Sequence, residues 1–205
     1  VELSLARAAP GPATDPALSP LRNVPPVVEF INQREGLTTN GGQQTTEHPI
    51  SDTQYATWRF TTFDVPGTKT FHANVGMYYG WQDIRGYDSI IPKQYVEMMN
   101  RISDQQGELL YNRIAPLYAV GQSPFGLNNP LLDLLGVKYV LTEQDIPDEA
   151  DDGTWTKIYD DQIVQIYENG QAFPRAFIAQ QALVTPADAQ PLLETDLRRF
   201  VFIEE

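Results

Sequence analysis

The segment 129–142, NPLLDLLGVKYVLT, constrains the fold most because it joins a well-capped helix directly to a strand. Asn129 is a favourable N-cap residue, Pro130 suits the first helical turn, and Gly136 stands where a helix commonly ends in a left-handed residue. The run VKYVLT that follows is rich in β-branched and aromatic residues, which predicts a buried strand.

Helical and extended patterns alternate along the rest of the chain. We expect helices in PPVVEFINQREG and from about residue 93 to 106, and a short helix opening at Thr185. We expect strands in TWRFTTFD, PRAFIAQ and RRFVFIEE, and a hairpin in WTKIYDDQIVQIYENG. This order predicts an α/β or α+β fold, with a single domain built on a mixed sheet of about 5–6 strands flanked by helices.

The domain organisation follows from composition. Residues 1–22 are rich in proline and alanine and predict an extended arm or tether. Residues 23–195 form the predicted α/β domain. Residues 196–205 form the terminal strand, with the start of a following β-rich region as the alternative interpretation.

Charge and residue usage narrow the function. The 14 basic and 27 acidic residues give a net charge of −13, which disfavours nucleic acid and anionic membrane surfaces as partners. The chain contains no cysteine, so thiolate chemistry is excluded. His48 and His72 lack the spacing of a zinc site, and no glycine pattern matches a nucleotide-binding loop. We therefore expect no metal and no cofactor.

The stretch 74–89, NVGMYYGWQDIRGYDS, concentrates the candidate chemistry. Asp83 and Asp88 flank Arg85, and two carboxylates at a suitable separation could act as the acid and base of a glycosidase. Alternatively, Arg85 binds one of the acids or loop carbonyls and locks an irregular segment.

The same loop carries aromatic side chains that suit either sugar stacking or burial against a sheet. These candidate ligand or structural residues are Asn74, Tyr78, Tyr79, Trp81 and Tyr87. Arg175, which follows a proline in AFPRAF, is a second candidate, either as a binding residue or as the partner of an acid.

Four segments in order resemble the extracytoplasmic region of the YfhO-type family, large bacterial polytopic membrane proteins related to the GT-C glycosyltransferases. They are ANVGMYYGWQDIRGYDSIIPKQYVEMMN, NPLLDLLGVKYVLT, IVQIYENGQAFPRAFIA and DLRRFVFIEE. Within the first segment, the matching positions include Gly76, Gly80 and Gly86. The loop that carries the catalytic acid in GT-C enzymes has no counterpart in these segments, so no catalytic residue is carried over.

The resemblance implies a non-catalytic extracytoplasmic domain on the outer face of the bacterial cytoplasmic membrane, within an integral membrane protein. Its implied partners are the membrane-embedded part of the same polypeptide and a glycan or polyprenyl-linked sugar, and the parent protein would act in cell-surface glycan or lipid-linked sugar transfer. Two alternatives remain: a carbohydrate-binding module that uses the 74–88 loop, and a glycosidase-like enzyme that uses Asp83 and Asp88.

Overall fold

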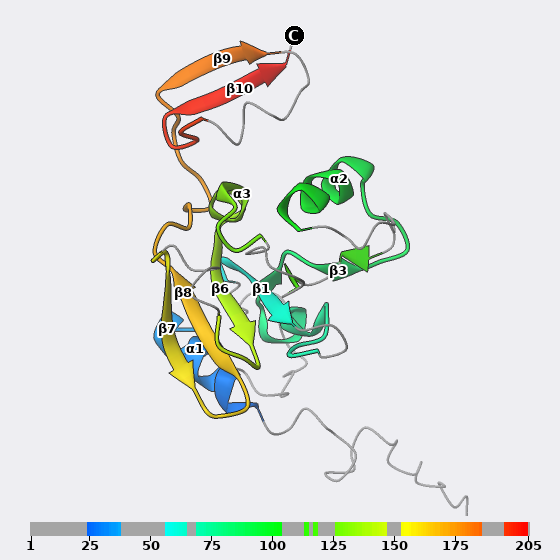
Figure 1. Cartoon of the computed structure of the whole chain (residues 1–205), viewed down its shortest axis with the longest axis vertical. Coiled ribbons are helices and arrows are strands. Elements are labelled where there is room, and N and C mark those ends of the chain that lie inside the picture. The colour runs from blue at the N-terminus through cyan, green and yellow to red at the C-terminus, as the bar shows by residue number, and fades with distance from the viewer. Residues whose placement is uncertain are drawn as a thin grey trace, which may run out of the picture. The chain divides into compact units, whose positions relative to one another are not determined.

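The computed structural model describes residues 24–37, 56–64, 69–103, 113–114, 117–118, 126–146, 153–185 and 195–204 (Figure 1). The predicted arm over 1–22 lies outside these ranges. The chain divides into two compact units, residues 1–54 and 55–205, and each is described by itself.

The described part of the first unit is the helix α1, Pro26–Glu35. Its first turn contains proline, whose fixed φ suits a helix start. Gly36 ends the helix in the left-handed region with φ 66°, and the amide of Leu37 donates to the carbonyl of Asn32 at 2.8 Å. The helix predicted in PPVVEFINQREG is confirmed.

The second unit is built on a mixed sheet with strand order β2-β1-β6-β8-β7 (Figure 1). Its central strands are β1, Arg59–Asp64, and β6, Val137–Thr142, which run parallel. The short strands β2, Gln82–Asp83, and β5, Leu117–Tyr118, also pair with β1 in parallel. The hairpin of β7, Trp155–Asp160, and β8, Gln165–Asn169, joins β6 in antiparallel fashion. The α/β fold with a mixed sheet is therefore confirmed.

Two helices contribute to the hydrophobic core of this unit: α2, Lys93–Ile102, and α3, Pro130–Leu134. Asn129 caps α3 because its Oδ1 accepts a hydrogen bond from the amide of Leu131 at 3.0 Å. Side chains of α2 and α3 cluster with those of β1 and β6, among them Met99, Leu131, Phe63 and Val140. These contacts fix the position of β1, which carries the candidate site.

Helix α2 ends four residues earlier than predicted. Ser103 is extended with φ −146°, and its amide still reaches the carbonyl of Met99 at 3.0 Å. Ile102 and Ser103 are both buried. The apolar face of α2 is therefore completed at Ile102, and residues 104–106 of the predicted helix lie outside the described part.

The strand predicted in PRAFIAQ is wrong, because residues 174–180 are irregular and Ile178 is 92% exposed. The strand in this region is β9, Gln181–Thr185, and it pairs in parallel with β10, Phe200–Glu204, the predicted terminal strand. Thr185, the predicted N-cap, is the last residue of β9, and the short helix predicted to follow it lies outside the described residues.

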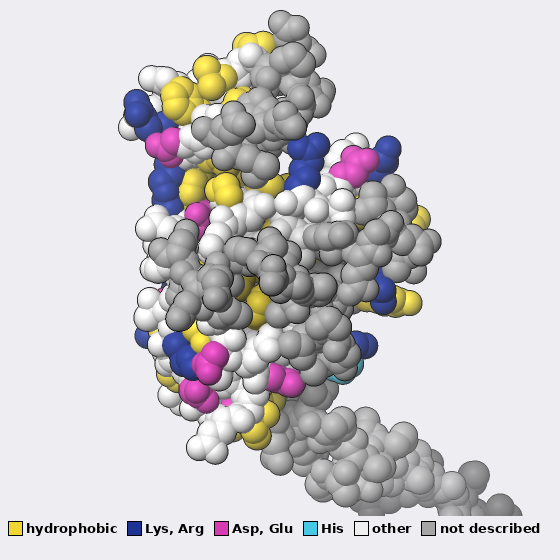
Figure 2. All heavy atoms as spheres, viewed as in Figure 1, with side chains coloured by type: hydrophobic (Ala, Val, Ile, Leu, Met, Phe, Trp, Pro, Cys, Tyr) yellow, Lys and Arg dark blue, Asp and Glu magenta, His cyan; other side chains and the backbone are white. Residues whose placement is uncertain are grey.

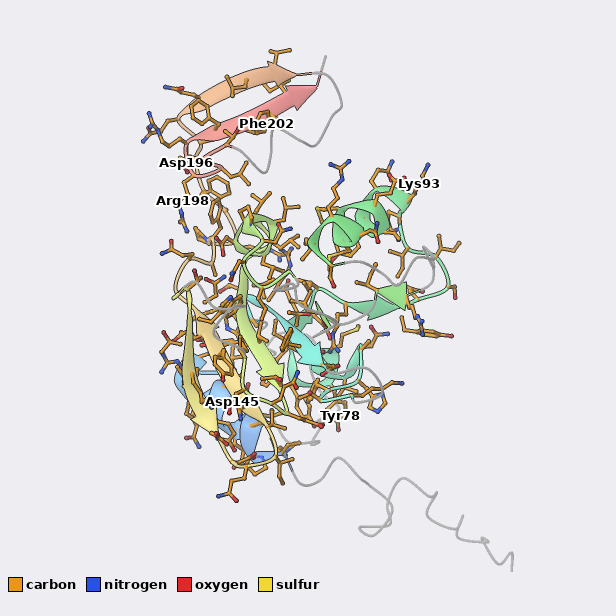
Figure 3. All side chains as sticks on the ribbon, in the orientation of Figure 1. Tyr78, Lys93, Asp145, Asp196, Arg198 and Phe202 are labelled. Atoms are coloured by element: carbon orange, nitrogen blue, oxygen red, sulfur yellow. The ribbon has the colours of Figure 1, made fainter. Side chains whose placement is uncertain are left out.

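The β9–β10 pair forms a two-stranded ribbon with apolar side chains on both faces. Val184 is 63% exposed, and Val201 and Ile203 beside it are 48% and 50% exposed. Figure 2 shows hydrophobic side chains gathered on this part of the molecule. Arg198, which Figure 3 labels near the base of the ribbon, lies over the ring of Phe173 at 4.2 Å.

In the part of the chain that the structure describes, no helix combines the length and the apolar character needed to cross a membrane.

Candidate functional site

The loop 74–88 turns tightly against the sheet. Asn74, in the left-handed region with φ 70°, precedes the 3-10 helix η3, Val75–Tyr79, and Gly80 ends it with φ 74°. Gly76 lies against the ring of Phe60, where a Cβ atom would come within 2.6 Å of Cε1. This close approach requires glycine and brings the loop onto β1.

Trp81 is part of an aromatic cluster behind this loop. It is 1% exposed, and its ring packs edge-on to Phe60 at 5.5 Å between centroids. Trp58, Phe71 and Tyr79 also lie beside it, with ring centroids at 5.7, 6.1 and 6.0 Å. Because its faces are covered, Trp81 cannot stack on a sugar in this conformation.

The side chain of Arg85 is buried and forms an ion pair with Asp83. Its Nε donates to Oδ1 at 3.0 Å and its Nη2 donates to Oδ2 at 2.7 Å, while the backbone amide of Arg85 also reaches Oδ1 at 2.8 Å. Both side chains are only 3% exposed. This is a buried, two-pronged ion pair that closes the turn between the two residues.

The polar network continues from Arg85 into β1. Nη1 of Arg85 donates to the hydroxyl of Thr62 at 2.6 Å, and that hydroxyl donates to Oδ2 of Asp64 at 3.1 Å. The other oxygen of Asp64 accepts from the hydroxyl of Thr70 at 2.6 Å. One guanidinium group thus joins the loop to the strand beneath it.

Sequence reasoning did not select Thr62, Asp64 or Thr70. The period of a strand offers one signal, because Thr62 and Asp64 alternate with Phe60 on one face of β1. Two polar residues at alternate positions of a buried strand indicate polar partners nearby, because buried polar groups are normally hydrogen-bonded.

Burial and the neighbouring Arg85 have opposite effects on the pKa of Asp83. Burial raises the pKa of the Asp83 carboxyl above its usual range, and attraction to Arg85 together with its hydrogen bonds counters that rise. With both oxygens engaged by one arginine, Asp83 has little freedom to act as a general acid or base.

Asp88 lies in a different environment from Asp83. It is exposed, and its Oδ1 accepts from the amide of Ser89 at 2.6 Å. Among the described residues, Asp83 is bound by Arg85 and Asp88 by the amide of Ser89, so the two carboxylates have different hydrogen-bond partners.

Asn74 and Tyr87 close the two ends of the loop. The side-chain amide of Asn74 donates to the carbonyl of Tyr87 at 2.7 Å, and its Oδ1 accepts from the Tyr87 amide at 3.3 Å. The side chain of Asn74 therefore has a structural role, because it holds the two ends of the loop together.

The tyrosines of the loop differ in exposure. Tyr87 is 65% exposed, and Tyr78 is 55% exposed and labelled in Figure 3. Tyr79 is half-buried against Phe71 and Trp81, and burial raises the pKa of its hydroxyl. Tyr78 and Tyr87 are therefore more exposed than Tyr79.

Arg175 reaches the same loop from a distant segment. Its Nη1 donates to Oε1 of Gln82 at 2.6 Å, and Nε2 of Gln82 donates to the carbonyl of Ala56 at 2.6 Å. The structure thus brings the second candidate residue to β2, through a glutamine that sequence reasoning did not select.

Within the described ranges, no three or more histidine, aspartate or glutamate side chains gather in a way that could hold a metal ion. No family model, curated protein or solved structure matches this chain. The resemblance to the YfhO-type family therefore stays a prediction.

Proposed function

We propose that this chain is a non-catalytic extracytoplasmic domain of a multi-span membrane protein resembling the GT-C glycosyltransferases. In this proposal the parent protein transfers cell-surface or lipid-linked sugars, and the domain packs on the membrane-embedded part of the same polypeptide. The observation that carries the proposal is the exposure of apolar side chains on the ribbon of β9 and β10.

The ribbon supports a docking role because parallel strands are normally covered on both faces. Two strands alone are marginally stable in water, and this pair presents Ala182, Val184, Val201 and Ile203 together on one face. Exposed apolar surface of this kind marks a contact with other protein or with a membrane. We therefore assign the ribbon to contact with further protein of the same polypeptide.

The network around Arg85 supports a non-catalytic role. A catalytic carboxylate needs access to substrate and a pKa suited to proton transfer. Asp83 is buried in an ion pair with Arg85, and Asp88 is an exposed loop residue. The polar groups of the 74–88 loop, which carries the family resemblance, thus stabilise the fold.

The proposal is tested by cysteine labelling of the full-length polypeptide in its membrane, with any other cysteine replaced. Val201→Cys on the ribbon is compared with Lys93→Cys, whose side chain is exposed on α2. A membrane-impermeant maleimide added to intact cells should label Cys at 93 and spare Cys at 201, and solubilised protein cut free of the spans should be labelled at both.

Two results contradict the proposal separately. Labelling of position 93 only after the cells are opened would remove the extracytoplasmic location. Equal labelling of both positions in the intact protein would remove the docking role of the ribbon.

A further inference from the structure

Two arginine side chains, Arg59 and Arg175, both lie beside Gln82 of β2. Arg59 and Gln82 are partners in the parallel pairing of β1 with β2, so their side chains stand side by side on one face of the sheet. Arg175 binds the same glutamine, with Nη1 at 2.6 Å from Oε1. Gln82 is therefore a common neighbour of the two arginines.

Neither arginine has an acidic partner among the described residues. The ion pairs in this part of the chain involve Arg85 and three lysines, and the partner of Arg59 is the carbonyl of Leu135, 2.5 Å from Nη1. The arginines thus bind neutral oxygens although acidic residues outnumber basic ones by 27 to 14 along the chain. Each of these bonds uses one of the five N–H groups of a guanidinium.

The neighbouring tyrosine does not supply the missing negative charge. Tyr95 of α2 donates its hydroxyl hydrogen to the carbonyl of Ile84 at 2.5 Å. Burial raises the pKa of Tyr95 to about 12, so this side chain is neutral at physiological pH. Burial and the nearby charge of Arg175 lower the pKa of Arg59, which is the expected effect of two like charges held together.

We propose that Arg59 and Arg175 form a binding site for a phosphomonoester, with the phosphate group held between the two guanidinium groups. Two fixed positive charges match the charge of about −2 that a phosphomonoester carries at neutral pH. Forked guanidinium groups also match the spacing of phosphate oxygens, whereas a carboxylate would leave one positive charge unbalanced.

The placement of the two side chains suits such a ligand. Arg175 is exposed, so the site is open to solvent, and Arg59 is half-buried and fixed by the carbonyl of Leu135. A partly buried charge is less screened by water and salt than a surface charge. The site is independent of the ribbon and of the function proposed above.

The test is isothermal titration calorimetry of the 205-residue chain at constant ionic strength. The probes are glycerol 3-phosphate as the phosphomonoester, inorganic phosphate and acetate. We expect saturable binding of both phosphates and affinity for acetate weaker by about tenfold or more. If the two phosphates bind with equal affinity, the site recognises the phosphate group alone. If glycerol 3-phosphate binds more tightly, the site also contacts the ester group.

Variants identify the residues. Arg175→Gln should weaken phosphate binding by roughly tenfold or more, since it removes charge-assisted hydrogen bonds. Arg101→Gln removes the same charge from an exposed position on α2 and should leave the affinity unchanged. Arg59→Lys keeps the charge and loses the fork, so an intermediate loss is expected.

A second measurement uses the unaltered chain alone. Phosphate should raise the thermal unfolding midpoint above that in sodium chloride of equal ionic strength, because binding to the folded state stabilises it by mass action. The proposal is overturned if neither phosphate gives a saturable titration, if acetate binds as tightly, or if Arg101→Gln weakens binding as much as Arg175→Gln.

Discussion

Replacing Arg85 by methionine should destabilise the fold strongly. The change removes the bonds from Nε and Nη2 to Asp83, at 3.0 and 2.7 Å, and the bond from Nη1 to Thr62, at 2.6 Å. Asp83 is 3% exposed on its side chain, so water does not replace the lost partner. Breaking a buried ion pair in this way costs about 3–5 kcal/mol, a large part of the roughly 5–15 kcal/mol that stabilises a typical domain.

The assay is urea unfolding at pH 7, followed by tryptophan fluorescence, because Trp58 and Trp81 lie in the aromatic cluster beside the site. With a typical urea dependence of about 2 kcal/mol per molar, the midpoint should fall by roughly 2 M. Arg101→Met, an exposed control, should change the free energy of unfolding by no more than about 0.5 kcal/mol.

A double variant and a change of pH both test how much of the loss comes from the unpaired, buried carboxylate of Asp83. The double variant Asp83→Asn/Arg85→Met should recover part of the loss, since no unpaired carboxylate remains. In Arg85→Met alone the loss should shrink as the pH falls from 7, because burial raises the pKa of Asp83 and the folded state then takes up a proton before the unfolded state does. A loss under about 1 kcal/mol at pH 7, or an equal loss in the double variant, would refute the assigned role of Arg85.

Three smaller perturbations test other parts of the fold, each by urea unfolding. Gly76→Ala places a Cβ 2.6 Å from Cε1 of Phe60 and should cost about 1–3 kcal/mol; a neutral result would contradict the tight approach of the loop. Asn129→Ala removes the cap of α3 and should cost about 1 kcal/mol, whereas an unchanged midpoint would show that the cap is dispensable. Tyr95 has a pKa raised to about 12 in the folded state and near 10 when unfolded, so stability should fall by at most about 3 kcal/mol between pH 10 and 12. Tyr95→Phe should flatten that fall, and an identical pH profile would count against the burial of this hydroxyl.

Features set by local chemistry could be predicted from the sequence. Asn129 caps α3 through a bond to a residue two positions away, and Gly36 ends α1 with the left-handed backbone that glycine adopts readily. The hairpin of β7 and β8 also follows from alternation around a short turn. In each case the deciding interaction lies within a few residues.

Features set by distant partners could not be predicted. Arg85 could reach several acids or carbonyls in its own loop, and nothing local indicates that Nη1 binds Thr62, 23 residues earlier. The strand predicted in PRAFIAQ is wrong because Phe177 and Ile178 are exposed and, among the described residues, have no sheet to pack against. Arg175 instead binds Gln82, 93 residues earlier. The two-residue strands β2 and β5 exist because β1 pairs with them, and no pattern of that length identifies a strand.

The proposed function requires the ribbon of β9 and β10 to be a docking element. Amide hydrogen exchange at Leu183 and Phe202 compares the isolated 205-residue chain with the full-length polypeptide in its membrane. Slow exchange only in the full-length polypeptide is the predicted result, because the ribbon is then covered by further protein. Equally fast exchange in both would contradict the proposal that this domain packs on the membrane-embedded part through β9 and β10.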